Sequence, residues 1–507
     1  MPTNVKENGF ESSIVSWLVQ HNGYEQGSNA DYNKEIAMDE TRLFRFLNTT
    51  QADKMKQLRL ENDPLEKEKF LQRLDQSLHT NGVIDLLRKG FRYKHLVLDM
   101  FYVRPSPGNE TAAKLYAQNI FSVTRQLQYS RQNPLLALDV CLFLNGLPIA
   151  TMELKNQLTK QNAADAVKQY KDERTPDEVL FGFKRCIVHF AVDDNEVRMC
   201  TELKGQKSWF LPFNKGYNDG AGNPPNPDGI KTDYLWKEIL RKDDFSNIIE
   251  NYVQIICDED EETHKKSYKQ IFPRYHQLQL VTSLLADAKR DGVGKRYLIQ
   301  HSAGSGKSNS IAWLAHQLVT LKDATDHNIF DTVIVVTDRV NLDKQIRNTI
   351  RQFMQVSSTV GWAKDSSELG TLLEKGTKII ITIVHKFQFI LEDISKLHTN
   401  RSFAILIDEA HSSQNGDLST KMNIVLSGSE YDNDDLLEDK INTLIDGKKL
   451  AKNASYFAFT ATPKNKTLEV FGREEIQPDG SKRFFPHYVY TICLLYTSPS
   501  PRDKRQS

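Results

Sequence analysis

The sequence lacks a long apolar run, a cysteine framework and an excess of charge of either sign. No apolar run approaches the ~18 residues that a membrane-spanning helix needs, and the polar N-terminus has no apolar core of a secretory signal. The five cysteines are widely spaced, with no Cys-x-x-Cys pair, which argues against a disulfide framework and against a zinc site. We therefore expect a soluble cytoplasmic protein with reduced thiols and no membrane association.

The acidic and basic side chains cancel, with 66 of each kind. A net charge of zero excludes a protein whose whole surface is basic, but it leaves a local basic groove for nucleic acid possible. At 507 residues the chain is too long for one hydrophobic core, so we expect two to four domains.

An acidic run followed by two lysines predicts a solvated, charged linker over residues 256–269. The chain would then consist of a first domain over residues 1–255, with a helical N-terminal part, and a second domain over residues 270–492. Residues 493–507 are rich in Ser, Pro and Arg, and we expect them to be disordered.

The first domain has the pattern of a small α/β unit, with two strands flanking the turn dipeptide Asn145-Gly146. In chain order we expect a helix over residues 111–129, strands over 135–144 and 149–155, a helix over 163–173 and a strand over 185–192.

The second domain alternates strands with helices. Its strands are near-continuous β-branched runs, which suits a parallel sheet that is buried on both faces. The five strands are expected at residues 297–300, 332–337, 378–383, 404–407 and 456–459. The predicted fold class is α/β in both domains.

A loop of small residues follows the first of these strands and leads into a helix. Such a loop turns backbone N–H groups inward and ends at a helix N-terminus, where an anion is stabilised. Lys307 would reach the terminal phosphates of ATP, and the Ser308 hydroxyl would bind Mg²⁺. The pattern G-x-x-x-x-G-K-[ST] has glycine where this chain has His301, and a plain glycine-rich turn is the alternative. The loop residues expected to hold the nucleotide are Gly304, Ser305, Gly306, Lys307 and Ser308.

Two carboxylates, Asp408 and Glu409, stand at the end of a later strand. Ligands bind beyond the carboxyl ends of the strands in open parallel sheets. Asp408 would hold Mg²⁺ through water, and Glu409 would orient or deprotonate the attacking water. The alternative is that these residues simply start a helix.

In the first domain, Asp139 interrupts an apolar strand and Glu153-Leu154-Lys155 ends the next one. A charge inside a buried strand is costly unless it is paired or bound to a metal. Two carboxylates and a lysine on one face can bind Mg²⁺ and activate a water for attack on a phosphodiester. The alternative is an ion pair between Lys155 and one of the carboxylates.

The hairpin makes this prediction testable. If Asn145-Gly146 were a plain two-residue turn, position 139 would pair with position 152, and Asp139 and Glu153 would point to opposite faces. The nuclease interpretation therefore requires an odd-length loop or a β-bulge, for example at Pro148. Glu11, Gln169 and Tyr170 are further candidates for the site, and their roles are open.

The motifs of the second domain resemble those of the first RecA-like lobe of superfamily 2 helicases and translocases. In chain order they are the phosphate loop, Val-Val-Thr-Asp-Arg (335–339), Asp-Glu-Ala-His (408–411) and Thr-Ala-Thr (460–462). The resemblance implies that Gln277 contacts adenine. In the first domain, Asp139 with Glu153-x-Lys155 resembles the PD-(D/E)xK nuclease fold, which implies that Asp139 and Glu153 are metal ligands.

The combination resembles the restriction (R) subunit of type I restriction–modification enzymes. The resemblance implies ATP and Mg²⁺ as cofactors, double-stranded DNA as substrate, and methylation (M) and specificity (S) subunits as partners. The implied activity is that of a type I site-specific deoxyribonuclease, in which ATP-dependent DNA translocation is coupled to endonucleolytic cleavage. We also expect that the chain is truncated before the second motor lobe and that residues 493–507 are foreign sequence.

Two other functions are compatible with the same motifs. One is a helicase–nuclease that acts alone in DNA repair or phage defence, without methylation partners. The other is a non-catalytic DNA-binding scaffold whose motifs have decayed, although the retained Lys307, Asp408 and Glu153 argue against such decay.

Overall fold

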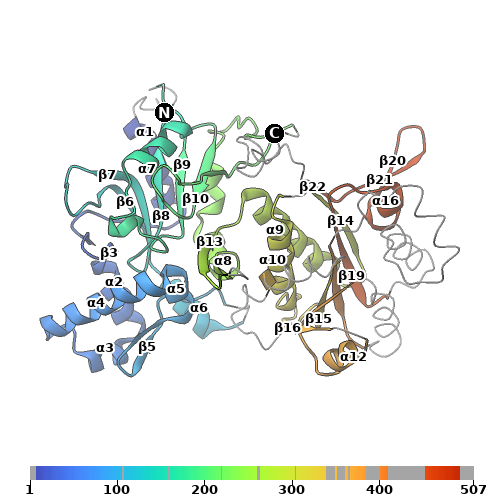
Figure 1. Cartoon of the computed structure of the whole chain (residues 1–507), viewed down its shortest axis with the longest axis horizontal. Helices are drawn as coiled ribbons and strands as arrows, with labels where there is room; N and C mark the ends of the chain where they lie inside the picture. The colour runs from blue at the N-terminus through green and yellow to red at the C-terminus, as the bar shows by residue number, and fades with distance from the viewer. Residues whose placement is uncertain are drawn as a thin grey trace. The chain divides into compact units, whose positions relative to one another are not determined.

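The computed structural model describes residues 7–105, 108–156, 160–218, 220–259, 263–302, 304–337, 349–350, 360–363, 366–383, 400–408 and 451–490. Two compact units share this part of the chain, one that runs up to Tyr275 and one that starts at His276 (Figure 1). No helix in these ranges is long and apolar enough to cross a membrane.

A mixed seven-stranded sheet forms the centre of the first unit, in the order β1-β6-β7-β8-β9-β10-β11. Its strands are β1 (Glu25–Gln26), β6 (Phe121–Gln128), β7 (Ala137–Leu144), β8 (Leu147–Leu154), β9 (Val188–Val192), β10 (Val197–Cys200) and β11 (Leu211–Pro212). The β1–β6 and β8–β9 pairs are parallel, and the others are antiparallel. The two strands expected to carry the nuclease residues, β7 and β8, therefore lie in the middle of the sheet.

Helices and three small hairpins complete the first unit. The helices are α1 (Glu7–Gln20), α2 (Glu40–Thr50), α3 (Ala52–Leu58), α4 (Pro64–Asn81), α5 (Val83–Lys89), α6 (Glu110–Ala117), α7 (Ala163–Asp172), η2 (Val179–Phe181), η3 (Leu235–Ile239) and α8 (Lys242–Asn251). The hairpins are β2 (Tyr32–Asn33) with β3 (Met38–Asp39), β4 (Phe91–Tyr93) with β5 (Leu96–Leu98), and β12 (Gln254–Glu259) with β13 (Lys266–Ile271).

Helix α7 is held against the sheet by an apolar stripe. Its buried residues recur at helical spacing, at Ala163, Ala166, Val167 and Tyr170. Asn162 and Asp165 form a capping box that satisfies backbone N–H groups at its start. The C-terminal end of α7 is thereby fixed in place.

Two sequence predictions for this unit are wrong. The helix expected over residues 111–129 ends at Ala117, and most of the rest of that segment is the strand β6, Phe121–Gln128. Between them, the Asn119 side chain bonds both the N–H and the carbonyl of Tyr102, and pairing of β6 with β7 outweighs the local helical pattern.

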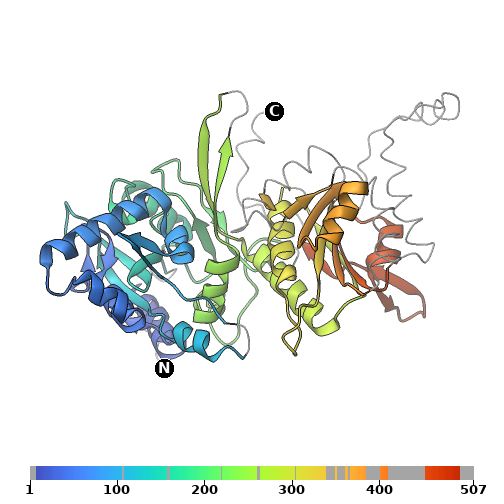
Figure 2. The same cartoon turned by 90° about the horizontal axis from the view of Figure 1, so that it is seen from below.

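Most of the described residues in the segment expected as a charged linker, 256–259 and 266–269, belong instead to the paired strands β12 and β13, which stand out clearly in Figure 2. Buried Gln270 attaches the hairpin to the first unit because its amide donates to the carbonyls of Cys186 and Ile187, at 2.8 Å each. The division between the units lies between Tyr275 and His276, beyond this hairpin.

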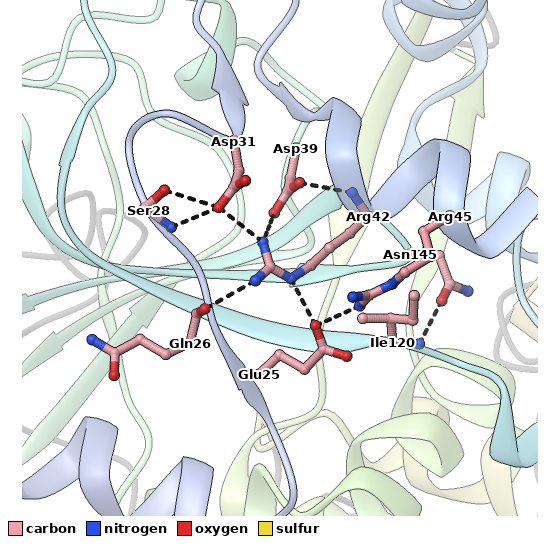
Figure 3. A network of polar contacts seen from close by, with 9 residues as sticks. All are labelled: Glu25, Gln26, Ser28, Asp31, Asp39, Arg42, Arg45, Ile120 and Asn145. Carbon is pink, nitrogen blue, oxygen red and sulfur yellow. Dashed lines mark hydrogen bonds and ion pairs between the residues drawn. The ribbon is translucent and has the colours of Figure 1, made fainter. Parts of the chain in front are cut away.

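A buried arginine ties the N-terminal elements together (Figure 3). The guanidinium of Arg42 donates to Asp39 at 2.6 Å, to Glu25 at 3.1 Å and to Asp31 at 3.3 Å. The network continues into the β7–β8 hairpin, because the Asp39 N–H donates to the Gly146 carbonyl at 2.9 Å. The turn of the hairpin is thus anchored from outside the sheet.

The second unit is built on a seven-stranded, wholly parallel sheet in the order β16-β17-β15-β18-β19-β14-β22. The strands are β14 (Arg296–His301), β15 (Thr332–Thr337), β16 (Val360–Trp362), β17 (Ile379–Ile383), β18 (Phe403–Ile407), β19 (Ala454–Thr460) and β22 (Tyr488–Tyr490). The helices are α9 (Tyr275–Asp291), α10 (Lys307–Val319), α12 (Ser366–Glu374) and α16 (Asn465–Phe471), and β20 (Arg473–Ile476) pairs with β21 (Lys482–Phe485).

All five strands predicted for this unit are present and parallel, which confirms the predicted α/β class. Every residue of β15, β18 and β19 is buried, as expected for strands covered on both faces.

Candidate functional sites

The β7–β8 hairpin contains the irregularity that the nuclease interpretation requires. Asn145 and Gly146 both have positive φ, +51° and +84°, as the two central residues of a type I′ turn do. Phe143 pairs with Pro148, but the next pair is Leu142 with Ala150, so Ile149 is an extra residue. The predicted β-bulge is confirmed, one residue after Pro148.

The bulge brings the two acidic side chains to the same face. Beyond it, Val140 pairs with Met152, and continuation of this register places Asp139 opposite Glu153. Asp139 Oδ2 accepts a hydrogen bond from the Leu154 N–H at 2.8 Å, which shows that the carboxylate lies beside the end of β8. The hairpin thus brings Asp139 and Glu153 together.

Glu153 is fully buried and only half of its carboxylate is satisfied. Oε1 accepts a hydrogen bond from Arg174 Nε at 2.6 Å, whereas Oε2 is buried with no hydrogen-bond partner among the described residues. Burial raises the pKa of Glu153 to about 8, with the charge of Asp139 acting in the same direction and those of Arg174 and Lys155 opposing it. A buried carboxylate oxygen without a donor suits a metal ligand.

Arg174, which follows the end of α7, lies in no motif that the sequence reveals. Its three nitrogens donate to Glu153, to the Tyr129 hydroxyl at 2.9 Å and to the Ala137 carbonyl at 2.9 Å. Because its side chain is 2% exposed, the guanidinium has little freedom to move. Only the rule that a buried carboxylate needs a partner could have pointed to such a residue.

Glu11 lies close to Asp139, and a glutamine links the two. Gln126 Nε2 donates to Glu11 Oε2 at 3.0 Å and to Asp139 Oδ1 at 3.2 Å, and Arg125 Nε donates to Glu11 Oε1 at 2.7 Å. Gln126 has φ +47° inside β6, an unusual backbone for a residue other than glycine. Because the segment of β6 was predicted as a helix, the sequence did not indicate that Gln126 lies at this site.

The three remaining candidates differ in their surroundings. Lys155 is 8% exposed, and its charge opposes the rise in the pKa of Glu153. The Tyr170 hydroxyl is hydrogen-bonded to Thr151 Oγ1 at 2.8 Å, and that oxygen is 2.7 Å from His189 Nδ1. Gln169 Oε1 is buried and has no hydrogen-bond partner in the part of the chain described.

In the second unit, the phosphate loop has the expected position between a strand and a helix. β14 ends at His301 and α10 begins at Lys307, and Gly304 and Gly306 have φ of +75° and +83°. Ser308 lies in the first turn of α10. Such a loop can present backbone N–H groups to an anion.

The loop lysine meets the carboxylate predicted to bind Mg²⁺. Lys307 Nζ lies 3.1 Å from Asp408 Oδ1, and their side chains are 11% and 2% exposed. Asp408 follows β18, so the structure brings together two residues that are about a hundred positions apart. Glu409, predicted as the base, lies outside the described residues.

Gln277 lies at the same loop. Its amide nitrogen donates to the Ser305 carbonyl at 3.2 Å and to the Gly306 carbonyl at 3.0 Å. A Cβ added to Gly306 would lie 2.3 Å from that nitrogen and would displace the end of the Gln277 side chain, and the φ of +83° itself favours glycine.

No group of three or more His, Cys, Asp or Glu side chains gathers in a metal-binding arrangement within the described ranges. Each predicted Mg²⁺ site would then rely on two of the predicted protein ligands, Asp139 with Glu153 and Ser308 with Asp408. Mg²⁺ commonly binds to one or two protein ligands and completes its octahedral shell with waters and phosphate oxygens, so the residues present fit this ion.

Comparison with known proteins assigns the two units to different families of domains. Residues 4–208 match the family model of the type I restriction enzyme R protein N terminus, and residues 276–478 match that of the SWI2/SNF2 ATPase.

Two curated relatives cover much of the chain. It is 26% identical over 376 residues to the type I restriction enzyme HindI endonuclease subunit of Haemophilus influenzae, a match that covers 71% of this chain and 33% of that protein. It is 25% identical over 488 residues to a type I restriction enzyme endonuclease subunit of Staphylococcus aureus, which covers 92% and 45%. The chain thus spans between a third and a half of the length of these relatives.

A solved fragment described as an HsdR subunit of a type I restriction enzyme from Vibrio vulnificus is 14% identical, with a TM-score of 0.26, and the match covers 70% of this chain and 50% of the fragment. A likeness this low carries no argument about the fold. The chain therefore combines a segment that matches the N-terminal domain family of type I restriction enzyme R proteins with one that matches the SWI2/SNF2 ATPase family, and both curated relatives are named type I restriction enzyme endonuclease subunits.

Proposed function

We propose that this chain supplies the nuclease domain and the first motor lobe of a type I restriction enzyme R subunit. In this function, ATP-dependent movement along double-stranded DNA is coupled to endonucleolytic cleavage. The observation that best supports the proposal is the buried Oε2 of Glu153, which has no hydrogen-bond partner among the described residues and lies beside Asp139. Burying two neighbouring carboxylates costs folding free energy unless they bind a cation.

In the nuclease domain, Asp139 and Glu153 would hold Mg²⁺, and Lys155 would lie beside the attacked phosphate. Bound Mg²⁺ would lower the pKa of a water and neutralise charge on the phosphodiester. Arg174 holds Oε1 of Glu153, so Oε2 is the oxygen left to face the ion. The Leu154 N–H holds Oδ2 of Asp139 in the same way.

In the motor lobe, the phosphate loop from Gly304 to Ser308 would hold the phosphates of ATP. Lys307 would exchange its contact with Asp408 for the terminal phosphates, and Ser308 and Asp408 would hold Mg²⁺. Glu409 would orient or deprotonate the attacking water, and Gln277 would contact adenine.

Methylation and specificity subunits are the partners that this function implies, because both relatives are named as subunits of type I restriction enzymes. The specificity subunit would then read the DNA sequence. A helicase–nuclease that acts alone is less well supported, because both relatives are named as subunits and neither is named as a stand-alone enzyme. A non-catalytic scaffold is also disfavoured, since it would have no need to keep Glu153 buried.

The decisive experiment measures Mg²⁺-dependent cleavage of plasmid DNA by the chain, with and without ATP and with and without methylation and specificity subunits. We expect cleavage that requires Mg²⁺, and we expect the subunits to co-purify with the chain. Absence of cleavage in every combination would refute the nuclease proposal, and cleavage stimulated by ATP without any partner would favour the stand-alone enzyme.

A further inference from the structure

The phosphate loop carries a buried histidine at the position where the sequence pattern has glycine. His301 is the last residue of β14, and it is fully inaccessible to solvent. Its two ring nitrogens face two serine hydroxyls: Nδ1 is hydrogen-bonded to Ser305 Oγ, and Nε2 lies 3.4 Å from Ser310 Oγ. Ser305 belongs to the loop, and Ser310 belongs to α10.

The contacts of Ser305 place a proton on one nitrogen of this ring. Ser305 Oγ donates its single proton to the Ser302 carbonyl, so it can only accept from His301. Nδ1 must therefore carry a proton and donate it to Ser305 Oγ. Nε2 faces the hydroxyl of Ser310.

A second histidine, His276, contacts the backbone of the same loop residue, Ser305. His276 Nε2 lies 3.4 Å from the Ser305 carbonyl, to which Gln277 also donates, and the His276 and His301 rings meet edge to face at 5.9 Å. In a trans peptide the carbonyl and the following N–H point in opposite directions. Because the Ser305 carbonyl is directed toward His276 and Gln277, the Gly306 N–H must point away from them.

We propose that His301 is a positioning residue that presets the phosphate loop for a polyphosphate, by donating from Nδ1 to the Ser305 hydroxyl. The glycine of the usual pattern gives the loop conformational freedom. The buried side chain of His301 instead favours one conformation of the loop before the ligand binds. The inference rests on the proposed nucleotide site and goes beyond it, because it assigns His301 and one of its ring atoms.

Three substitutions separate the ring atoms. In His301→Asn, the side-chain amide nitrogen can take the place of Nδ1, whereas in His301→Gln it reaches as far as Nε2. His301→Leu removes both. Isothermal titration of the full chain with Mg·ATP and Mg·ADP gives the affinities, and thermal unfolding shows whether each variant is folded. His316→Asn is the control, because His316 is a partly buried histidine of α10 that is hydrogen-bonded to the Ile350 carbonyl.

We expect His301→Leu and His301→Gln to weaken the affinity for both nucleotides by about tenfold, the effect of leaving a buried hydroxyl without its donor. His301→Asn should stay within about threefold of the unsubstituted chain, and His316→Asn should not change the affinity. Equal affinities for the Asn, Gln and Leu variants would overturn the assignment of Nδ1. Failure of the unsubstituted chain to bind Mg·ATP would instead refute the proposed nucleotide site itself.

Discussion

Arg174 Nε lies 2.6 Å from Glu153 Oε1, and both side chains are almost inaccessible to solvent. The pair joins Arg174, two residues beyond the end of α7, to the central strand β8. It leaves one oxygen of the carboxylate satisfied and the other without a donor in the described structure. Burial favours the neutral form of Glu153, and the arginine opposes this shift of its pKa, toward the charged form that a metal needs.

The first prediction concerns this pair. Arg174→Met should lower the free energy of unfolding by about 3–5 kcal/mol, because it leaves Glu153 buried without its partner. The double variant Arg174→Met with Glu153→Gln should recover part of that loss, since no charge is then buried. Thermal and denaturant unfolding of the three variants measure both effects. A single variant as stable as the unsubstituted chain would contradict the importance of the pair.

The second prediction concerns pH. The pKa of Glu153 is raised from 4.5 to about 8, mainly by burial. Between these two values the folded chain keeps a proton that the unfolded chain has lost, so this group's contribution to stability decreases as pH rises through that window. Mg²⁺ must displace the proton, so its affinity for the site should rise with pH and level off above about pH 8.

Thermal unfolding as a function of Mg²⁺ concentration, at pH 6, 7, 8 and 9, measures this affinity. Glu153→Gln has no carboxylate to titrate, and it should show neither the pH dependence nor the stabilisation by Mg²⁺. A Mg²⁺ affinity that is the same at all four pH values would be incompatible with Glu153 as a ligand.

The third prediction concerns cleavage. Asp139→Ala and Lys155→Ala should abolish any Mg²⁺-dependent cutting of plasmid DNA, by at least about a hundredfold, because each removes a group proposed to contact the metal or the phosphate. Asp177→Ala is the control, since Asp177 is an exposed carboxylate whose recorded contacts are with Thr175. Unchanged cutting by both site variants would remove the assignment of these residues.

The sequence predicted that the site hairpin must contain an odd-length loop or a bulge if its two carboxylates are to share a face. The spacing of Asp139 and Glu153 around Asn145-Gly146 required an irregularity, and the structure has one at Ile149. The parallel sheet of the second unit followed from its β-branched runs in the same way. In both places the local pattern and the tertiary structure favour the same arrangement.

Tertiary contacts explain what the sequence did not reveal. Arg174 and Gln126 gain their positions from residues far away in the chain, and neither has a motif around it. The segment of Gln126 has a helical pattern but pairs as a strand, because burial beside β7 outweighs helix propensity. The hairpin tolerates the acidic residues Asp258 and Glu259 of the predicted linker because both are exposed at the end of β12.

The fourth prediction concerns the ion pair of the motor lobe. Lys307→Ala should abolish measurable binding of Mg·ATP, because it removes the charge that contacts the terminal phosphates. Asp408→Asn should weaken Mg·ATP more than ATP measured in the presence of a chelator, since its proposed role is to hold the metal. Cleavage of DNA in the absence of ATP should persist in both variants, as the nuclease residues lie in the other unit. Loss of that cleavage would show that the two sites are not separable.

The last prediction tests the anchoring of the site hairpin. Gly146 has φ +84°, and a Cβ there would lie 2.4 Å from the carbonyl oxygen of Asp39, which is backbone and cannot easily move aside. Gly108 has nearly the same φ, +87°, with nothing within 4 Å of an added Cβ. Gly108→Ala should therefore cost about 1–2 kcal/mol of stability, the strain of a positive φ alone.

Gly146→Ala adds the steric clash to the same strain, so it should cost clearly more than Gly108→Ala. It should also shift the hairpin, which would separate Asp139 from Glu153 and reduce Mg²⁺-dependent cleavage, whereas Gly108→Ala should leave cleavage unchanged. Unfolding free energies and plasmid cleavage measured side by side decide the point. Equal losses in the two variants would mean that contact with Asp39 does not set the position of the turn.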